Sequence, residues 1–144
     1  MLKKLPAVIS PEMLKCLAEM GHGDEIVIAD ANFPGASVAR RLIRCDGIGI
    51  PGLLEAVMTL LPLDDFVEQP VALMAVGHGE GEPGVWEEYR QILQRHEAAA
   101  FCNGFEMMER FAFYERAKNA YAVIQSGERA LYANILLKKG VVRE

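Results

Sequence analysis

The fold is decided by residues 10–30, which read SPEMLKCLAEMGHGDEIVIAD. Ser10 and Pro11 predict the start of a helix, because a serine hydroxyl caps free backbone N–H groups and proline fits the first helical position. We expect the helix to end at Gly21, which accepts a left-handed backbone. The segment 25–29 (EIVIA) is a continuous apolar run rich in β-branched residues. Such a run predicts a short strand that is covered on both faces.

The same two patterns recur along the rest of the chain. Further helices are predicted from Pro51, from Pro83 and from Phe111 to about Asn119, because apolar residues return there at helical spacing. Residues 31–40 are predicted to form a loop, and strands are predicted at 42–45, 71–76, 121–125 and 131–137. A turn at residues 126–128 would join the last two strands as a hairpin. Alternating helices and buried strands predict the α/β class: one three-layer α/β/α domain over residues 1–144 with a mixed sheet.

Composition excludes several classes of protein. The 144 residues suffice for one domain with a single core, and the net charge of −5 is spread along the chain. A nucleic-acid partner is not expected, because no basic stripe is present. A membrane partner is not expected either, because no apolar run approaches the roughly 20 residues that span a bilayer. Three cysteines without Cys-x-x-Cys spacing argue against a disulfide framework or zinc site and predict a cytoplasmic protein.

His22 and Asp30 are the first candidate site residues. His22 lies between Gly21 and Gly23, which have no side chains to shield it, so its imidazole should be accessible. Histidine, with an unperturbed pKa of about 6.5, can both give and take a proton near neutrality. Asp30 closes the first predicted strand, at the end where open α/β sheets bind ligands. Each residue has a plainer interpretation, as a polar turn residue for His22 and a strand-ending turn residue for Asp30.

Three further candidates lie in the C-terminal third. Tyr132 and Asn134 are two residues apart in a predicted strand, so both should point to one face. A phenol and an amide offer donors and acceptors suited to sugar hydroxyls, although an ordinary half-exposed strand would carry the same pattern. Arg110 precedes an aromatic helix and could contact a ligand or form a structural ion pair.

Other motifs do not predict a cofactor or a metal. Residues 47–52 match Gly-x-Gly-x-x-Gly, but no acidic residue closes a strand about 20 residues later, as a dinucleotide site requires. Residues 77–81 lack the Gly-Lys-Ser/Thr ending of a phosphate-binding loop. His22, His78 and His96 are too widely spaced for a local metal motif, although folding could gather two of them.

The candidate residues also carry a family resemblance. The chain resembles the RbsD/FucU family of fucose mutarotases and ribose pyranases in segments at both ends: 9–14, 17–26, 30–34, 110–117, 126–129 and 132–140. The C-terminal segments are closest to the fucose branch, whereas residues 64–106 are less distinctive. No family role attaches to His78.

The resemblance implies a function and a site. His22 matches the family's proton-donating histidine, and the substrate-binding positions are matched by Asp30, Arg110, Tyr132, Ala133 and Asn134. Residue 32 is Asn here, where similar proteins also have His. The implied activity is that of an isomerase that interconverts the anomers of L-fucose without a cofactor or metal.

Further expectations follow from the family's architecture and chemistry. The family forms homo-oligomers, commonly decameric rings, with sites near subunit contacts. In the expected mechanism Asp30 holds either His22 or a sugar hydroxyl. A ribose pyranase and a non-catalytic sugar-binding or transport-accessory protein remain the alternatives.

Overall fold

A six-stranded sheet forms the middle of the molecule. The computed structural model describes residues 1–144 and contains the strands β1 (Glu25–Ala29), β2 (Leu42–Cys45), β3 (Val71–Met74), β4 (Glu106–Met108), β5 (Ala122–Ser126) and β6 (Ile135–Lys138). Their order across the sheet is β2-β5-β1-β6-β3-β4. The segments predicted at 25–29 and 42–45 are therefore confirmed with the predicted bounds.

The sheet is mixed because of β6 alone. β6 runs antiparallel to both of its neighbours, β1 and β3, whereas the pairs β1–β5, β2–β5 and β3–β4 are parallel. The predicted closing hairpin is wrong, because β1 lies between β5 and β6. The chain from β5 to β6 must instead cross the carboxyl end of β1, and this crossing brings residues 131–134 next to Asp30.

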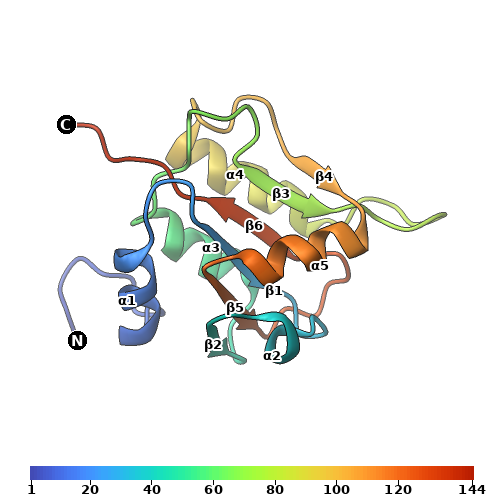
Figure 1. Cartoon of the computed structure of the whole chain (residues 1–144), viewed down its shortest axis with the longest axis horizontal. Helices are drawn as coiled ribbons and strands as arrows, with labels where there is room; N and C mark the ends of the chain where they lie inside the picture. Colours follow the sequence, from blue (N-terminus) through green and yellow to red (C-terminus); the bar gives the residue numbers. More distant parts are fainter.

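Helices cover both faces of the sheet and give the predicted three layers (Figure 1). One face packs against α1 (Pro11–Glu19), α3 (Ile50–Met58) and α4 (Val85–Glu97), and the other packs against α2 (Gly35–Val38) and α5 (Arg110–Asn119). Because strand side chains alternate, Ile26 and Ile28 enter the first core, whereas Val27 and Ala29 enter the second. The α/β class and the single mixed sheet are confirmed.

Helix α1 begins as predicted but ends differently. The Ser10 hydroxyl accepts a hydrogen bond from the Met13 N–H at 3.1 Å, and Pro11 is the first helical residue. The helix ends at Glu19, and Met20 is already extended. The left-handed residue is Gly23, with φ of +87°, rather than Gly21. The loop that carries His22 is therefore longer than predicted.

Three other elements differ from the prediction by more than two residues, whereas β3 and β5 differ from the predicted strands 71–76 and 121–125 by at most two residues at their ends. The short helix α2 lies within the predicted loop 31–40, and the edge strand β4 was not predicted. β6 begins at Ile135, four residues later than expected, because Leu131 and Tyr132 form a turn in which Tyr132 has φ of +56°.

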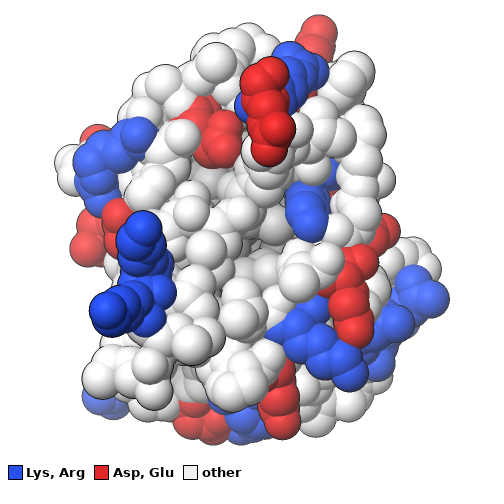
Figure 2. Space-filling model, turned by 90° about the vertical axis from the view of Figure 1, so that its left-hand side faces the viewer, with Lys and Arg blue, Asp and Glu red and all other residues white.

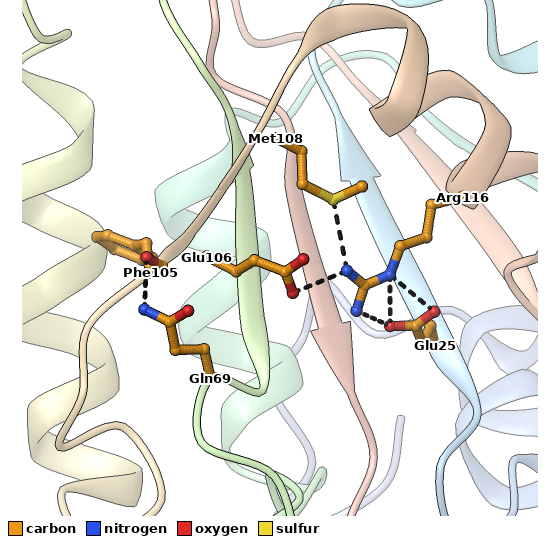
Figure 3. A network of polar contacts seen from close by, with 6 residues as sticks. All are labelled: Glu25, Gln69, Phe105, Glu106, Met108 and Arg116. Atoms are coloured by element: carbon orange, nitrogen blue, oxygen red, sulfur yellow. Dashed lines mark hydrogen bonds and ion pairs between the residues drawn. The ribbon is translucent and has the colours of Figure 1, made fainter.

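Arg116 on α5 joins a central strand to an edge strand (Figure 3). Its guanidinium donates to Glu25 on β1 at 3.0 Å and to Glu106 on β4 at 2.8 Å. The hydrogen bonds with Glu25 raise the pKa of Arg116 above its usual range despite the burial. Strands β6 and β3 lie between β1 and β4, so these contacts fix α5 across four strands of the sheet.

Charged side chains of both signs are interspersed on the face shown in Figure 2, around a largely uncharged centre. That face carries neither a basic nor an acidic stripe. None of the helices combines the length and the hydrophobicity that crossing a membrane requires.

Candidate functional site

A pocket of about 190 Å³ opens at the carboxyl end of β1, where the β5–β6 connection crosses it. The volume is below the roughly 300–1,000 Å³ of pockets for drug-sized ligands, so it suits a single small polar molecule. The pocket is lined by Asp30, Asn32, Phe33, Met74, Arg110, Tyr114, Leu131, Tyr132 and Asn134. Four of the predicted site residues, Asp30, Arg110, Tyr132 and Asn134, therefore meet in one place.

Asp30 is the most firmly held residue of the pocket. Its backbone N–H donates to the Asn134 side chain at 2.7 Å, and its carbonyl accepts from the Gln125 amide at 2.6 Å. One carboxylate oxygen accepts from the Asn32 N–H at 2.9 Å. Burial raises the pKa of the Asp30 carboxyl, although hydrogen bonds from backbone N–H groups act in the opposite direction. Asp30 therefore both closes its own turn and presents a carboxylate to the pocket.

Tyr132 and Asn134 reach the pocket from a turn rather than from a strand. Two aromatic residues of α4 hold this turn: Trp86 Nε1 donates to the Tyr132 carbonyl at 2.9 Å, and the Tyr89 hydroxyl donates to the Ala133 carbonyl at 2.7 Å. Ala133 itself is fully buried and its side chain packs in the core. Its side chain does not line the pocket, so only the backbone of Ala133 is near the other predicted site residues.

Arg110 is the first residue of α5, and it forms no ion pair with a carboxylate of its own chain. Its Nε donates to the Tyr114 hydroxyl at 3.1 Å. Its guanidinium also lies 5.4 Å from the centres of the Phe111 and Tyr114 rings. The remaining guanidinium N–H groups are free to bind a hydroxyl-bearing ligand.

His22 lies at the opposite end of β1 from this pocket. Its side chain is 44% exposed, as predicted, and its Nε2 is 3.0 Å from Asp64 Oδ1. The ring also contacts Phe66, with ring centres 5.0 Å apart. The five residues of β1 span about 16 Å at roughly 3.3 Å per residue. The expectation that Asp30 of the same chain holds His22 is therefore wrong.

Asp64 is the residue that the sequence reasoning missed. It is buried, and burial by itself would raise the pKa of the carboxyl, but hydrogen bonds from the Phe66 N–H and His22 outweigh it and hold that pKa below its usual range. Asp64 reaches His22 because Leu63 bridges to Lys139, whose carbonyl also accepts from the Gly23 N–H. His22 and Asp64 are 42 positions apart in the sequence, so no local pattern predicts that they are in contact. The pairing depends on the long-range order of the sheet.

Two of the other motifs, the glycine-rich segment 47–52 and His96, have structural explanations. A carboxylate oxygen of Glu128 accepts from the Ile50 N–H at 3.2 Å, so it occupies the end of α3 where a nucleotide phosphate would bind. His96 is bonded to Glu55 on α3 at 2.7 Å. His78 lines a neighbouring hollow of about 440 Å³ that shares Arg110 and Tyr132 with the pocket.

Comparisons with known proteins agree with this architecture. Residues 3–142 match the model of the "RbsD / FucU transport protein family". The chain is 53% identical to the human fucose mutarotase over 98% of this chain and 94% of that protein. It is 49% identical to the L-fucose mutarotase of Actinobacillus pleuropneumoniae, over 98% of this chain and 97% of that protein.

Solved structures of fucose mutarotases and of RbsD have the same fold as this chain. The crystal structure of the Streptococcus pneumoniae fucose mutarotase in complex with L-fucose superposes with a TM-score of 0.94 at 51% identity, over 99% of this chain and 100% of that one. Bacillus subtilis RbsD complexed with D-ribose superposes with a TM-score of 0.71 at 25% identity, over 99% of this chain and 100% of that one. The chain belongs to the RbsD/FucU family.

Proposed function

We propose that the protein is a mutarotase that interconverts the α and β anomers of L-fucose by acid–base chemistry. The observation that carries this proposal is the pocket in which a carboxylate, a guanidinium, two phenols and two amides face one small volume. Relatives at about half identity over nearly the whole chain, which are themselves fucose mutarotases, support the same assignment. The related fucose mutarotase of Streptococcus pneumoniae binds L-fucose, which supports a free monosaccharide as the substrate.

The reaction needs proton transfer and positioning. A pyranose is a cyclic hemiacetal, so the hydroxyl on C1 loses a proton while the ring oxygen gains one. The ring opens to the aldehyde, the C1–C2 bond rotates, and closure of the ring gives the other anomer. No redox change or group transfer occurs. Positioned acids and bases typically accelerate such steps by about 10²–10⁴-fold.

The pocket residues supply the contacts with the sugar. The Asp30 carboxylate accepts hydrogen bonds from hydroxyls, the Arg110 guanidinium donates to sugar oxygens, and Asn134 completes the wall next to Asp30. Phe33, Met74 and Leu131 form an apolar side that suits the methyl group of a 6-deoxy sugar. His22 donates the proton to the ring oxygen, and Tyr132 or a water molecule relays the proton of the anomeric hydroxyl.

His22 must come from a second copy of the chain, because β1 separates it from the pocket of its own subunit. Both ends of the sheet carry exposed apolar side chains: Phe111 and Leu131 near the pocket, and Phe66 beside His22. A contact between copies of the chain would remove these three side chains from water. A head-to-tail contact would bring the His22 end of one subunit to the pocket of the next, and repeated contacts of this type close into a ring. We propose a decameric ring that acts in the cytoplasm, where its three free cysteines would stay reduced.

Two alternatives remain. A ribose pyranase would use the same open-chain intermediate, but the identity to the ribose-bound relative is 25%, against 51% to the fucose-bound one. A non-catalytic sugar-binding protein would use the same hydroxyl contacts without needing a titratable group. The exposed imidazole paired with a buried carboxylate favours catalysis.

NMR magnetisation exchange between anomeric protons tests the proposal on a panel of free aldoses. L-fucose should exchange fastest, and His22→Ala should reduce exchange toward the spontaneous rate, whereas His96→Gln should not. Undiminished exchange in folded His22→Ala would remove His22 from the mechanism. Faster exchange of D-ribose than of L-fucose would instead support the pyranase.

A mixing experiment tests the sharing of the site. His22→Ala and Asn134→Ala should each be inactive alone. Unfolding and refolding them together should restore roughly a quarter of wild-type activity, since random assembly pairs an intact histidine with an intact pocket at one contact in four. No recovery from mixed, correctly assembled subunits would contradict a shared site.

A further inference from the structure

Lys139 makes contacts that are unusual for a lysine at the end of a strand. Its ammonium donates to the Leu17 carbonyl at 3.1 Å and to the Met20 carbonyl at 2.5 Å. These carbonyls belong to the last turn of α1 and to the residue that follows the helix. A cation at this position interacts favourably with the carboxyl end of the helix. The side chain is half-buried and has no carboxylate partner.

The backbone of Lys139 holds the other side of the same loop. Its N–H donates to the Asp24 carbonyl at 2.8 Å, and its carbonyl accepts from the Gly23 N–H at 2.8 Å. Lys139 therefore holds the chain on both sides of His22: its ammonium bonds to residues before His22, and its backbone bonds to residues after it. Within residues 21–24 the only side-chain hydrogen bond to the backbone is local: the Asp24 carboxylate accepts from the Gly21 N–H at 2.7 Å.

The loop needs such a support because its own sequence gives it little rigidity. Gly21 and Gly23 flank His22, and glycine loses more conformational freedom on folding than any other residue. His22 itself is held by Asp64 and Phe66, which fix the ring but not the backbone beneath it. In the proposed function His22 donates a proton to a sugar bound on another subunit. The ring and the backbone of residues 21–23 must therefore both be held in place.

We infer that Lys139 is a positioning residue for His22: its ammonium fixes the loop so that the imidazole projects at a constant place and angle. This inference rests on the proposed function, in which His22 is the proton donor. It assigns a role in catalysis to a side chain that touches neither the sugar nor the imidazole.

The test replaces Lys139 by Met, which keeps most of the unbranched side chain and both backbone hydrogen bonds but removes the ammonium. The kcat for anomer exchange should fall about 10- to 100-fold, because small misplacements of a catalytic group have effects of this size. The KM should stay within about twofold, since the sugar pocket lies at the other end of β1. Amide hydrogen exchange at residues 21–23 should become faster. Lys139→Arg, which can donate to the same two carbonyls, should recover part of the kcat.

Lys118→Met is the matched control, because the Lys118 ammonium bonds only to Glu115 on the same helix. It should leave kcat, KM and the exchange of residues 21–23 unchanged. Lys139→Met that folds with wild-type kcat, or that loses thermal stability alone, would overturn the inference. The amide-exchange measurement does not depend on activity. It therefore reports on the loop separately from the His22→Ala result that decides the proposed function.

Discussion

The imidazole Nε2 of His22 lies 3.0 Å from the Oδ1 of Asp64, a carboxylate that is almost completely buried, whereas the His22 side chain is 44% exposed. The carboxylate also accepts from the Phe66 N–H at 3.1 Å, so its position is fixed independently of His22. With Nε2 engaged by Asp64, Nδ1 is the ring nitrogen left for a substrate. A carboxylate in this arrangement selects the tautomer and orientation of a histidine.

Asp64→Asn should therefore impair catalysis more than folding. The amide keeps the size of the side chain and an oxygen for the Phe66 N–H, but it removes the negative charge that sets the tautomer and orientation of the His22 ring. Anomer exchange should fall about 10- to 100-fold, which is part of the 10²–10⁴-fold that a general acid or base contributes. NMR magnetisation exchange on L-fucose gives the rate, and thermal unfolding gives the stability.

Asp65→Asn is the control for this change. Asp65 is the next residue, but its carboxylate pairs with Arg143 at the surface rather than with His22. The rate of anomer exchange in Asp65→Asn should match that of the unmodified protein. Equal rates in both variants would show that the His22–Asp64 contact has no part in catalysis.

Asp30→Asn should change how stability depends on pH. Burial raises the pKa of Asp30 in the folded protein above the value of about 3.9 expected for the unfolded chain. The folded state therefore holds its proton more tightly, and this contribution to stability is lost as the pH rises from about 4 through the raised pKa. The difference in unfolding free energy between Asp30→Asn and the unmodified protein should shift in favour of the variant over that range and then stay constant.

Chemical denaturation at a series of pH values measures this difference. Sugar binding should be lost in Asp30→Asn at every pH, because the variant lacks the carboxylate that faces the pocket. A difference in unfolding free energy that is flat between pH 4 and 7 would mean that the pKa of Asp30 is not raised in the folded protein.

Much of the fold could be predicted from local patterns, but the completed site could not. Helix α1 and strand β1 follow from a cap, a proline and an apolar run, which act within a few residues of one another. The resemblance and the residue types also indicated the polar side of the pocket. The order of β5, β1 and β6 depends on long-range packing, so the predicted hairpin was wrong. The partner of His22 was missed for the same reason.

Arg116→Met should destabilise the sheet. The guanidinium is mostly buried between Glu25 and Glu106, and its removal would leave the Glu25 carboxylate without its partner in a half-buried place (Figure 3). The loss should be about 2–4 kcal/mol of unfolding free energy, since breaking a buried ion pair is costly. Urea denaturation measures it. Arg44→Met, which removes a largely exposed pair with Asp46, should barely change stability. Equal effects of the two substitutions would contradict a structural role for the Arg116 contacts.

Gly35 and Gln125 should behave as a coupled pair. A Cβ on Gly35 would lie 2.2 Å from Gln125 Oε1 and 3.2 Å from a methyl group of Leu42. Gln125 is buried and its amide nitrogen is bonded to the Asp30 carbonyl, so it cannot turn away without losing that bond. Gly35→Ala should therefore cost about 1–3 kcal/mol of unfolding free energy, the usual effect of overpacking.

The double variant Gly35→Ala/Gln125→Ala separates crowding from other causes. Removing the carboxamide removes the collision and also an oxygen that is buried without a hydrogen-bond donor. Adding Gly35→Ala to Gln125→Ala should therefore cost much less than adding it to the unmodified protein, with a coupling energy of about 1 kcal/mol or more. Urea denaturation of the four proteins completes the cycle. Additive effects would mean that Gly35 is needed for the backbone of α2 rather than for the space that Gln125 occupies beside Asp30.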